Sequence, residues 1–134
     1  MYIIPQIWFT FTKGREHSLF LSSLGRVYSC GDNESGQCGI RINERDPYQG
    51  IPPQIVPFLY DITKICCGAD HNLCIDKNGA IWSFGFNGSG QLGLGEEYKG
   101  RLEIDAAIIN PCFKGKTNEN KVIFVDCGDY HSLC

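Results

Sequence analysis

The chain has 134 residues, of which 43% are apolar and 20% charged, and its 12 Lys and Arg against 15 Asp and Glu give a net charge of −3. This length fits one domain, and a charge balance without a long basic run argues against nucleic acid as the main partner. No apolar stretch reaches the roughly 20 residues of a membrane-spanning helix, and apolar residues are too frequent for a disordered chain. Since no segment keeps a helical apolar period over three turns, the sequence predicts a turn-rich β protein.

The first twelve residues are apolar, but they carry no basic stretch and Pro5 interrupts them. This segment therefore lacks the pattern of a secretory signal. We expect the protein to work in a reducing compartment, with its eight cysteines free of disulfides.

Two blocks of residues recur along the chain. Residues 25–39 and 79–93 share the skeleton Gly, apolar, aromatic, Ser, apolar, Gly, followed by Asn and by Ser-Gly-Gln-x-Gly. A second block, Gly-x-x-His, occurs three times with its histidines 54 and 60 residues apart, at residues 14–17, 68–71 and 128–131. Periods of this size indicate a repeat architecture.

The period divides the chain into the closing half of one repeat, a whole repeat and a repeat truncated in its last strand, at residues 1–24, 25–78 and 79–134. The whole repeat predicts four short strands, at residues 26–30, 54–56, 62–67 and 71–75. Asn78-Gly79 joins the last of these to the next repeat, and it tolerates the positive φ that a type I′ hairpin turn needs at both central positions. Four antiparallel strands per period are typical of a β-propeller blade. We expect an all-β fold, an incomplete β-propeller of four-stranded antiparallel blades over residues 1–134, with no helix longer than about two turns.

The repeat resembles that of the regulator of chromosome condensation family. The residues that carry this resemblance are Gly90-Gln91-Leu92-Gly93 and Gly128-Asp129-Tyr130-His131-Ser132, and residues 36–39 depart from the first motif only by Cys38. The chain has no Trp-Asp dipeptide and no Gly-Gly pair, so the WD and kelch propeller patterns fail. The resemblance implies a seven-bladed propeller in the cytoplasm, the nucleus or both. Because this chain holds about two and a half repeats, we expect it to be a fragment of a longer protein.

The repeated glycines and histidines are interpreted as structural. Glycine at a strand end or sharp turn avoids a clash of the β-carbon, and a histidine beside such a turn is expected to hydrogen-bond loop backbone. Three catalytic histidines at equivalent positions would not form one active site, and we find no nucleophile–base pair or carboxylate dyad, so we expect no enzyme activity. The structural positions are Gly14, His17, Gly31, Gly39, Gly68, His71, Gly85, Gly93, Gly128 and His131.

Two patterns that suggest ligands are better explained by the repeat. Cys-x3-His-x2-Cys, at residues 67–74 and 127–134, has a spacing compatible with zinc. The first repeat, however, has Lys13 and Phe20 in the cysteine slots, and Cys30 aligns with Phe84, which is the behaviour of a small core residue. Residues 88–93 match Gly-x-Gly-x-x-Gly, but no helix that could bind a pyrophosphate is predicted after them. We therefore expect no metal and no cofactor.

The two residues inside each Gly-x-x-His block differ between repeats. They are Arg15 and Glu16, then Ala69 and Asp70, then Asp129 and Tyr130. Loops on a propeller rim bind partners, so we assign Arg15, Glu16, Asp70, Asp129 and Tyr130 to a partner-binding rim. In the founding family member an acidic residue of this loop contributes to nucleotide exchange on a Ran-type GTPase, and the resemblance implies that role for Asp70. The ultraviolet-B receptor branch has Gly-Trp-Arg-His in these loops, which this chain lacks.

Two function classes remain. The first is a non-catalytic protein-interaction propeller, as in family members that are ubiquitin ligases, kinases or trafficking factors, and we favour it. The alternative is a guanine-nucleotide exchange factor for a Ran-type small GTPase, which rests on one carboxylate. The expected partner is a protein, such as a small GTPase, a ubiquitin-pathway protein or a chromatin protein.

Overall fold

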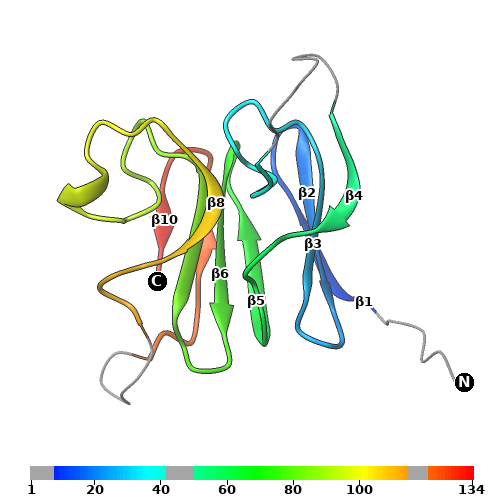
Figure 1. Ribbon diagram of the computed structural model, residues 1–134. Helices are drawn as coiled ribbons and strands as arrows, with labels where there is room; N and C mark the ends of the chain where they lie inside the picture. Colours follow the sequence, from blue (N-terminus) through cyan, green and yellow to red (C-terminus); the bar gives the residue numbers. More distant parts are fainter. Residues whose placement is uncertain (1–7, 42–49, 115–120) are drawn as a thin grey trace, which may run out of the picture.

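The computed structural model describes residues 8–41, 50–114 and 121–134. The strands form two four-stranded antiparallel sheets and the start of a third (Figure 1). Blade 1 contains, in spatial order, β1 (Trp8–Lys13), β2 (His17–Ser22), β3 (Val27–Gly31) and β4 (Ile51–Ile55). Blade 2 contains β5 (Ile62–Cys67), β6 (His71–Asp76), β7 (Ile81–Phe86) and β8 (Glu103–Ile109). The third sheet contains β9 (Asp126–Cys127) and β10 (Ser132–Leu133).

This arrangement confirms the predicted all-β propeller architecture of four-stranded antiparallel blades. Among the described residues the longest helix is the three-residue 3-10 helix η1 (Glu96–Tyr98), and none is long and apolar enough to cross a membrane. The sequence repeat is offset from the blade. Residues 25–78 supply the last two strands of blade 1 and the first two of blade 2, so each repeat links neighbouring blades.

The hairpin between β6 and β7 forms where Asn78-Gly79 predicted it, but its predicted turn type is wrong. Gly79 has a φ of +77°, whereas Asn78 is not among the residues with positive φ. The carboxylate of Asp76 accepts hydrogen bonds from the amides of Asn78 (2.8 Å) and Ala80 (3.1 Å). Because the Asp76 carboxylate holds the loop through these hydrogen bonds, Gly79 adopts the left-handed conformation and Asn78 does not.

The main hydrophobic core lies between the two complete blades. Leu19, Leu21 and Val27 of blade 1 pack against Cys74 and Phe84 of blade 2. All five are buried, and Cys74 is fully so, which fits its interpretation as a core residue. Alternation along the strands places these side chains on facing surfaces of adjacent sheets.

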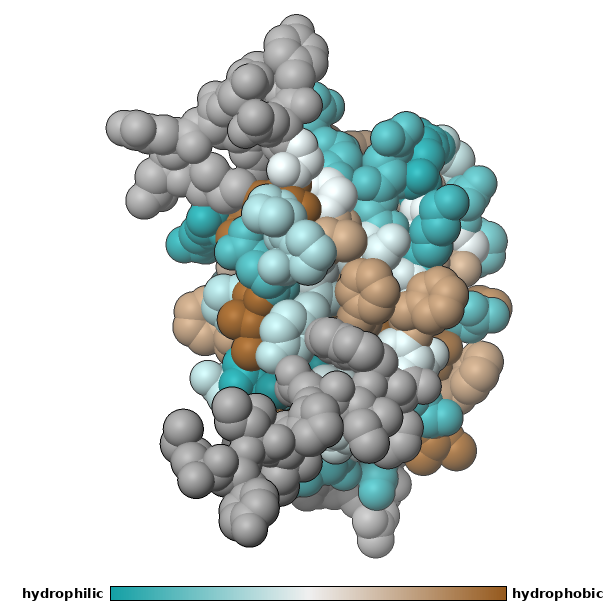
Figure 2. Space-filling view, turned by 90° about the vertical axis from the view of Figure 1, so that its right-hand side faces the viewer, coloured by the Kyte–Doolittle hydropathy of each residue, from teal (hydrophilic) through white to brown (hydrophobic). Residues whose placement is uncertain are grey.

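The outer face of blade 1 is apolar at positions whose equivalents in blade 2 are buried or partly buried. Figure 2 shows brown side chains gathered among teal ones on this side of the molecule. Phe11 and Phe20 have ring centroids 6.3 Å apart, and Phe11 is 69% exposed. The equivalent residues of blade 2, Ile65 and Cys74, belong to the core between the blades. Blades 1 and 2 thus present equivalent apolar faces.

The expectation that all cysteines are free of disulfides is contradicted, because Cys66 and Cys127 form a disulfide. Their Cα atoms are 6.0 Å apart although 61 residues separate them in sequence. The physical reason is the stacking of blades, which brings β5 of blade 2 alongside β9 of the third sheet. The remaining six cysteines form no disulfide.

Candidate interaction rim

The three Gly-x-x-His blocks form the loops between the first and second strands of successive sheets. They lie at the upper end of the molecule in Figure 1. The amide of Arg15 donates to the carbonyl of Ala69 (2.8 Å), and the amide of Ala69 donates to that of Asp129 (3.2 Å). Each loop is therefore fastened to the next by an equivalent backbone hydrogen bond.

The motif needs glycine because the imidazole of its own histidine lies against the glycine backbone. A β-carbon at Gly14 or Gly68 would overlap the ring of His17 or His71. The glycine amide also donates to the histidine carbonyl, at 2.9 Å for Gly14 and 2.8 Å for Gly68. Gly128 repeats both features with His131. This close approach explains why glycine and histidine recur together.

The histidines reach loop backbone through a side chain of the next sheet, and not directly as the sequence suggested. Nε2 of His17 lies 2.7 Å from Oδ1 of Asn72, whose amide nitrogen donates to the carbonyl of Gln37 (2.6 Å). Nε2 of His71 lies 3.0 Å from Oγ of Ser132, which donates to the carbonyl of Gln91 (2.8 Å). We call this arrangement the interblade relay.

The relay also fixes the protonation of its histidines. Oδ1 of Asn72 can only accept, so Nε2 of His17 carries the proton. The hydroxyl of Ser132 donates its one proton to the carbonyl of Gln91, so it accepts from Nε2 of His71. Nδ1 of both rings is buried without a hydrogen-bond partner among the described residues. Burial lowers the pKa of His17, and it lowers the pKa of His71 to about 4. Both rings are thus neutral at physiological pH.

Three of the five predicted rim residues meet above this relay. Nη2 of Arg15 donates to the hydroxyl of Tyr130 (2.9 Å), and its Nη1 lies 3.5 Å from Oδ2 of Asp70. The hydrogen bond to Tyr130, followed by the charge of Asp70, raises the pKa of Arg15. The side chain of Arg15 is 53% exposed and that of Asp70 22%. One residue from each loop therefore contributes to a single contact at the surface.

A hollow of about 670 Å³ lies beside this contact and is acidic. Nε2 of Gln37 (2.6 Å) and the amide of Glu34 (3.3 Å) hold the carboxylate of Asp32 in place. The side chains that line the hollow are one cation and four carboxylates together with a serine: Arg15, Glu16, Asp32, Glu34, Asp70 and Ser35. Its negative potential suits a partner with a basic surface.

The structure therefore places Glu16 in the hollow with Arg15 and Asp70, whereas Asp129 contributes its backbone carbonyl to the fastening of the loops. Asp32 and Glu34 were missed in the sequence analysis. A usable signal existed, since Asp32 aligns with Phe86 of the next repeat and Glu34 with Gly88. The variation between repeats that singled out the loop residues also marks these two.

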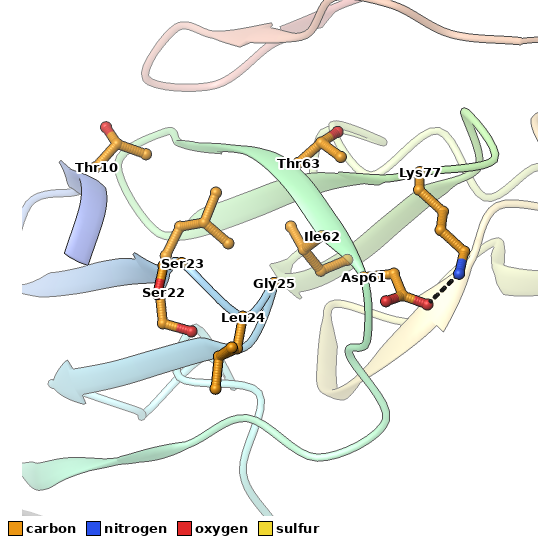
Figure 3. A pocket seen from close by; sticks show the side chains of 10 residues that line it. Thr10, Ser22, Ser23, Leu24, Gly25, Asp61, Ile62, Thr63 and Lys77 are labelled. Carbon is orange, nitrogen blue, oxygen red and sulfur yellow. Dashed lines mark ion pairs between the residues drawn. The ribbon is translucent and has the colours of Figure 1, made fainter. Parts of the chain in front are cut away.

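A second hollow, of about 520 Å³, lies at the opposite end of the blades (Figure 3). Leu21 and Ile62 form part of its walls, and Lys77 pairs with Asp61 at 2.9 Å. The amides of Ile62 and Lys77 donate to the carbonyls of Gly25 (2.9 Å) and Asp61 (2.8 Å). The first of these bonds joins the two blades, the second lies within blade 2, and the one ion pair among the lining residues is internal. We therefore place the candidate site at the upper rim.

The fold and the rim define a β-propeller repeat protein that presents variable side chains on repeated loops. The family model for the regulator of chromosome condensation (RCC1) repeat matches residues 25–75 and 78–134, and a second RCC1 repeat model matches residues 62–91. The chain belongs to the RCC1 repeat family.

Similar proteins cover nearly all of this chain. Human "Probable E3 ubiquitin-protein ligase HERC6" is 38% identical over 125 residues, which are 90% of this chain and 11% of that protein. The Xenopus laevis "Protein RCC2 homolog" is 35% identical over 136 residues, 90% of this chain and 26% of that protein. This chain thus spans only about a tenth to a quarter of these relatives.

Solved structures show the same fold. Prp20p of Saccharomyces cerevisiae has a TM-score of 0.79 at 23% identity, covering 97% of this chain and 31% of that one. Human WBSCR16 has a TM-score of 0.73 at 28% identity, covering 92% of this chain and 30% of that one. The sheets of this chain therefore correspond to a part of a longer propeller in those proteins.

Proposed function

We propose that this chain is part of a non-catalytic protein-interaction propeller that binds its partner through the upper rim. One observation carries the proposal: Arg15, Asp70 and Tyr130, from three successive repeats, meet at one exposed contact. The supporting glycines and histidines repeat, whereas these three residues differ from repeat to repeat. A surface built from variable side chains on an invariant support is what selective binding requires.

The proposed partner is a protein with a basic surface, in the cytoplasm, the nucleus or both. The acidic hollow beside Arg15 supports this charge preference. Relatives indicate which proteins to test. Prp20p is described by its binding to Gsp1p and histones, and yeast RCC1 by its complex with Kap60. The similarity to a probable ubiquitin ligase adds ubiquitin-pathway proteins to these candidates.

Guanine-nucleotide exchange on a Ran-type small GTPase is the second candidate. A human protein named "RCC1-like G exchanging factor-like protein" is 36% identical over 84 residues, 61% of this chain and 18% of that protein. Asp70 is the residue proposed to act in exchange. Its carboxylate is already paired with Arg15 and is only 22% exposed, so we rank exchange below simple binding.

The test uses the whole protein that contains this chain, with core histones and a Ran-type GTPase as immobilised probes. Asp70→Ala and Glu16→Ala should each weaken binding about fivefold or more, because each removes a carboxylate that lines the acidic hollow. Glu96→Ala is the matched control, because Glu96 is an 86% exposed carboxylate outside the rim. Release of a fluorescent guanine nucleotide from the GTPase, measured in parallel, separates exchange from binding. Unchanged binding by both rim variants, with normal thermal melts, would refute the proposal.

A further inference from the structure

We infer that Cys66 and Cys127 form a reversible thiol–disulfide site that holds the third rim loop in its binding position. Oxidation fastens the loop beneath Tyr130, and reduction releases it. The consequence for partner binding rests on the proposed function, whereas the effect on the loop does not.

The position of the bond links it to the rim. Cys66 lies in β5, and Cys127 lies in β9 directly before Gly128, where the loop that carries Tyr130 begins. The two strands that flank this loop pair through only two residue pairs, Ser132 with Cys127 and Leu133 with Asp126. So short a ladder gives the loop little support of its own. A covalent bond at the first residue before the loop therefore controls where Tyr130 lies.

The same two repeat positions meet between blades 1 and 2, but there they form a hydrogen bond. Thr12 occupies the position of Cys66 in the preceding repeat, and Cys67 occupies that of Cys127. Oγ1 of Thr12 accepts a hydrogen bond from the amide of Cys67 (3.2 Å). The two sheet-to-sheet contacts thus offer a matched comparison. A disulfide joins blade 2 to the third sheet, and a hydrogen bond at the same repeat positions joins blade 1 to blade 2.

The thiols of Cys67 and Cys74 are poorly suited to exchange with this pair. Burial raises the pKa of Cys67 to about 12, and it also raises the pKa of Cys74. Neither forms the thiolate that attacks a disulfide. Cys112 and Cys134 are exposed. Cys66 and Cys127 are the only bonded pair among the described cysteines.

The oxidant is a low-molecular-weight disulfide. One cysteine thiolate attacks it, forms a mixed disulfide and releases one small thiol. The second cysteine, as its thiolate, then attacks the protein sulfur of the mixed disulfide and releases the other small thiol. The two cysteines lose two electrons and two protons in total, and the small disulfide is reduced to two thiols. A dithiol reductant reverses the reaction. In a reducing compartment a disulfide of this kind is a transient, redox-responsive bond.

Amide hydrogen exchange followed by NMR tests the inference without any partner. The amide of Ala69 donates to the carbonyl of Asp129 across the sheet-to-sheet contact with the disulfide, and the amide of Arg15 donates to that of Ala69 across the contact without it. Changing from oxidised glutathione to dithiothreitol should speed exchange at Ala69 by about tenfold or more and leave Arg15 within about twofold. Alkylation and mass spectrometry of the same samples establish whether the bond is present.

Two variants sharpen the test. Cys66→Ser should make exchange at Ala69 fast and insensitive to redox state, whereas Cys112→Ser, which removes an exposed free thiol, should behave as wild type. The inference is wrong if Cys66 and Cys127 are both alkylated after oxidation, or if both amides respond equally.

The outcome is distinguishable from a failure of the proposed function. Asp70→Ala binding assays with oxidised glutathione present throughout test the rim alone, and the Ala69 amide tests the disulfide alone. Binding of the wild-type protein to core histones should fall at least about fivefold on reduction if the loop must be held. A responsive Ala69 amide with unchanged histone binding by a protein that is sensitive to Asp70→Ala would overturn the regulatory step.

Discussion

Replacing His71 by Ala is expected to destabilise the protein. The ring of His71 is fully buried, lies against Gly68 and hydrogen-bonds Ser132 in the next sheet. Truncating a buried aromatic ring costs about 3–5 kcal/mol, and a lost hydrogen bond about 1 kcal/mol. Imidazole is smaller than a phenyl ring, and removing it also relieves the cost of an unpartnered buried Nδ1. We therefore expect a loss of about 2–3 kcal/mol in the free energy of unfolding.

Urea unfolding monitored by circular dichroism measures this loss, and thermal melts should show a midpoint lower by roughly 10 °C. Glu96→Ala is the control, because its carboxylate is 86% exposed. Its effect should stay within about 0.5 kcal/mol. A loss below about 1 kcal/mol for His71→Ala would show that the interblade relay does not stabilise the fold. A His71→Ala variant that folds normally but loses binding would reverse the assigned roles of support and contact.

Three further predictions follow from the same contacts. Because burial depresses the folded-state pKa of His17 and His71 below the ordinary 6.5, the unfolded chain binds more protons, so stability should fall as pH drops from 6.5 towards 4. For His71 the shift corresponds to at most about 3 kcal/mol, which solvent screening near the rim should reduce to about 1–2 kcal/mol, and urea unfolding of wild type and His71→Ala at pH 7 and pH 5 measures the difference. Asp70→Ala should change stability by about 0.5 kcal/mol or less in thermal melts while weakening partner binding, since it removes only a rim ion pair. Cys30→Phe and Cys38→Leu, which copy the aligned Phe84 and Leu92, should each lower the free energy of unfolding in urea by less than about 1.5 kcal/mol. The loss should be larger for Cys38→Leu than for Cys30→Phe, because the Cys38 thiol lies 3.3 Å from the carbonyl oxygen of Asp32.

Local patterns made most of the fold predictable. Strand alternation and turn glycines placed β5 correctly and β3 and β6 within one residue at each end. The start of β4 was missed, since Pro52 and Pro53 indicated a break, yet β4 is the outermost strand of its sheet, where an absent amide donor is tolerated. The turn before β7 was misjudged because a side chain, that of Asp76, determines its shape. Such contacts are not contained in backbone preferences.

The site was predictable only in part, for a related reason. Comparing repeats located Arg15, Asp70 and Tyr130, but nothing in the sequence indicated that a single guanidinium would join the other two. The disulfide could not be found by aligning repeats, because Cys66 and Cys127 occupy different positions in the repeat. Only the stacking of one sheet on the next brings these positions together.

The offset between repeat and blade explains why support and recognition are carried by different residues. Each buried histidine needs an acceptor supplied by the next sheet, so a change in either partner leaves a buried polar group unsatisfied, at a cost of about 1–3 kcal/mol. The rim residues have no such constraint, since an exposed pair such as Arg15 and Asp70 contributes only about 0–1 kcal/mol. Substitutions at the rim therefore alter the surface offered to a partner with little effect on folding. This difference in cost lets one repeated framework hold its histidines constant while its loops diverge.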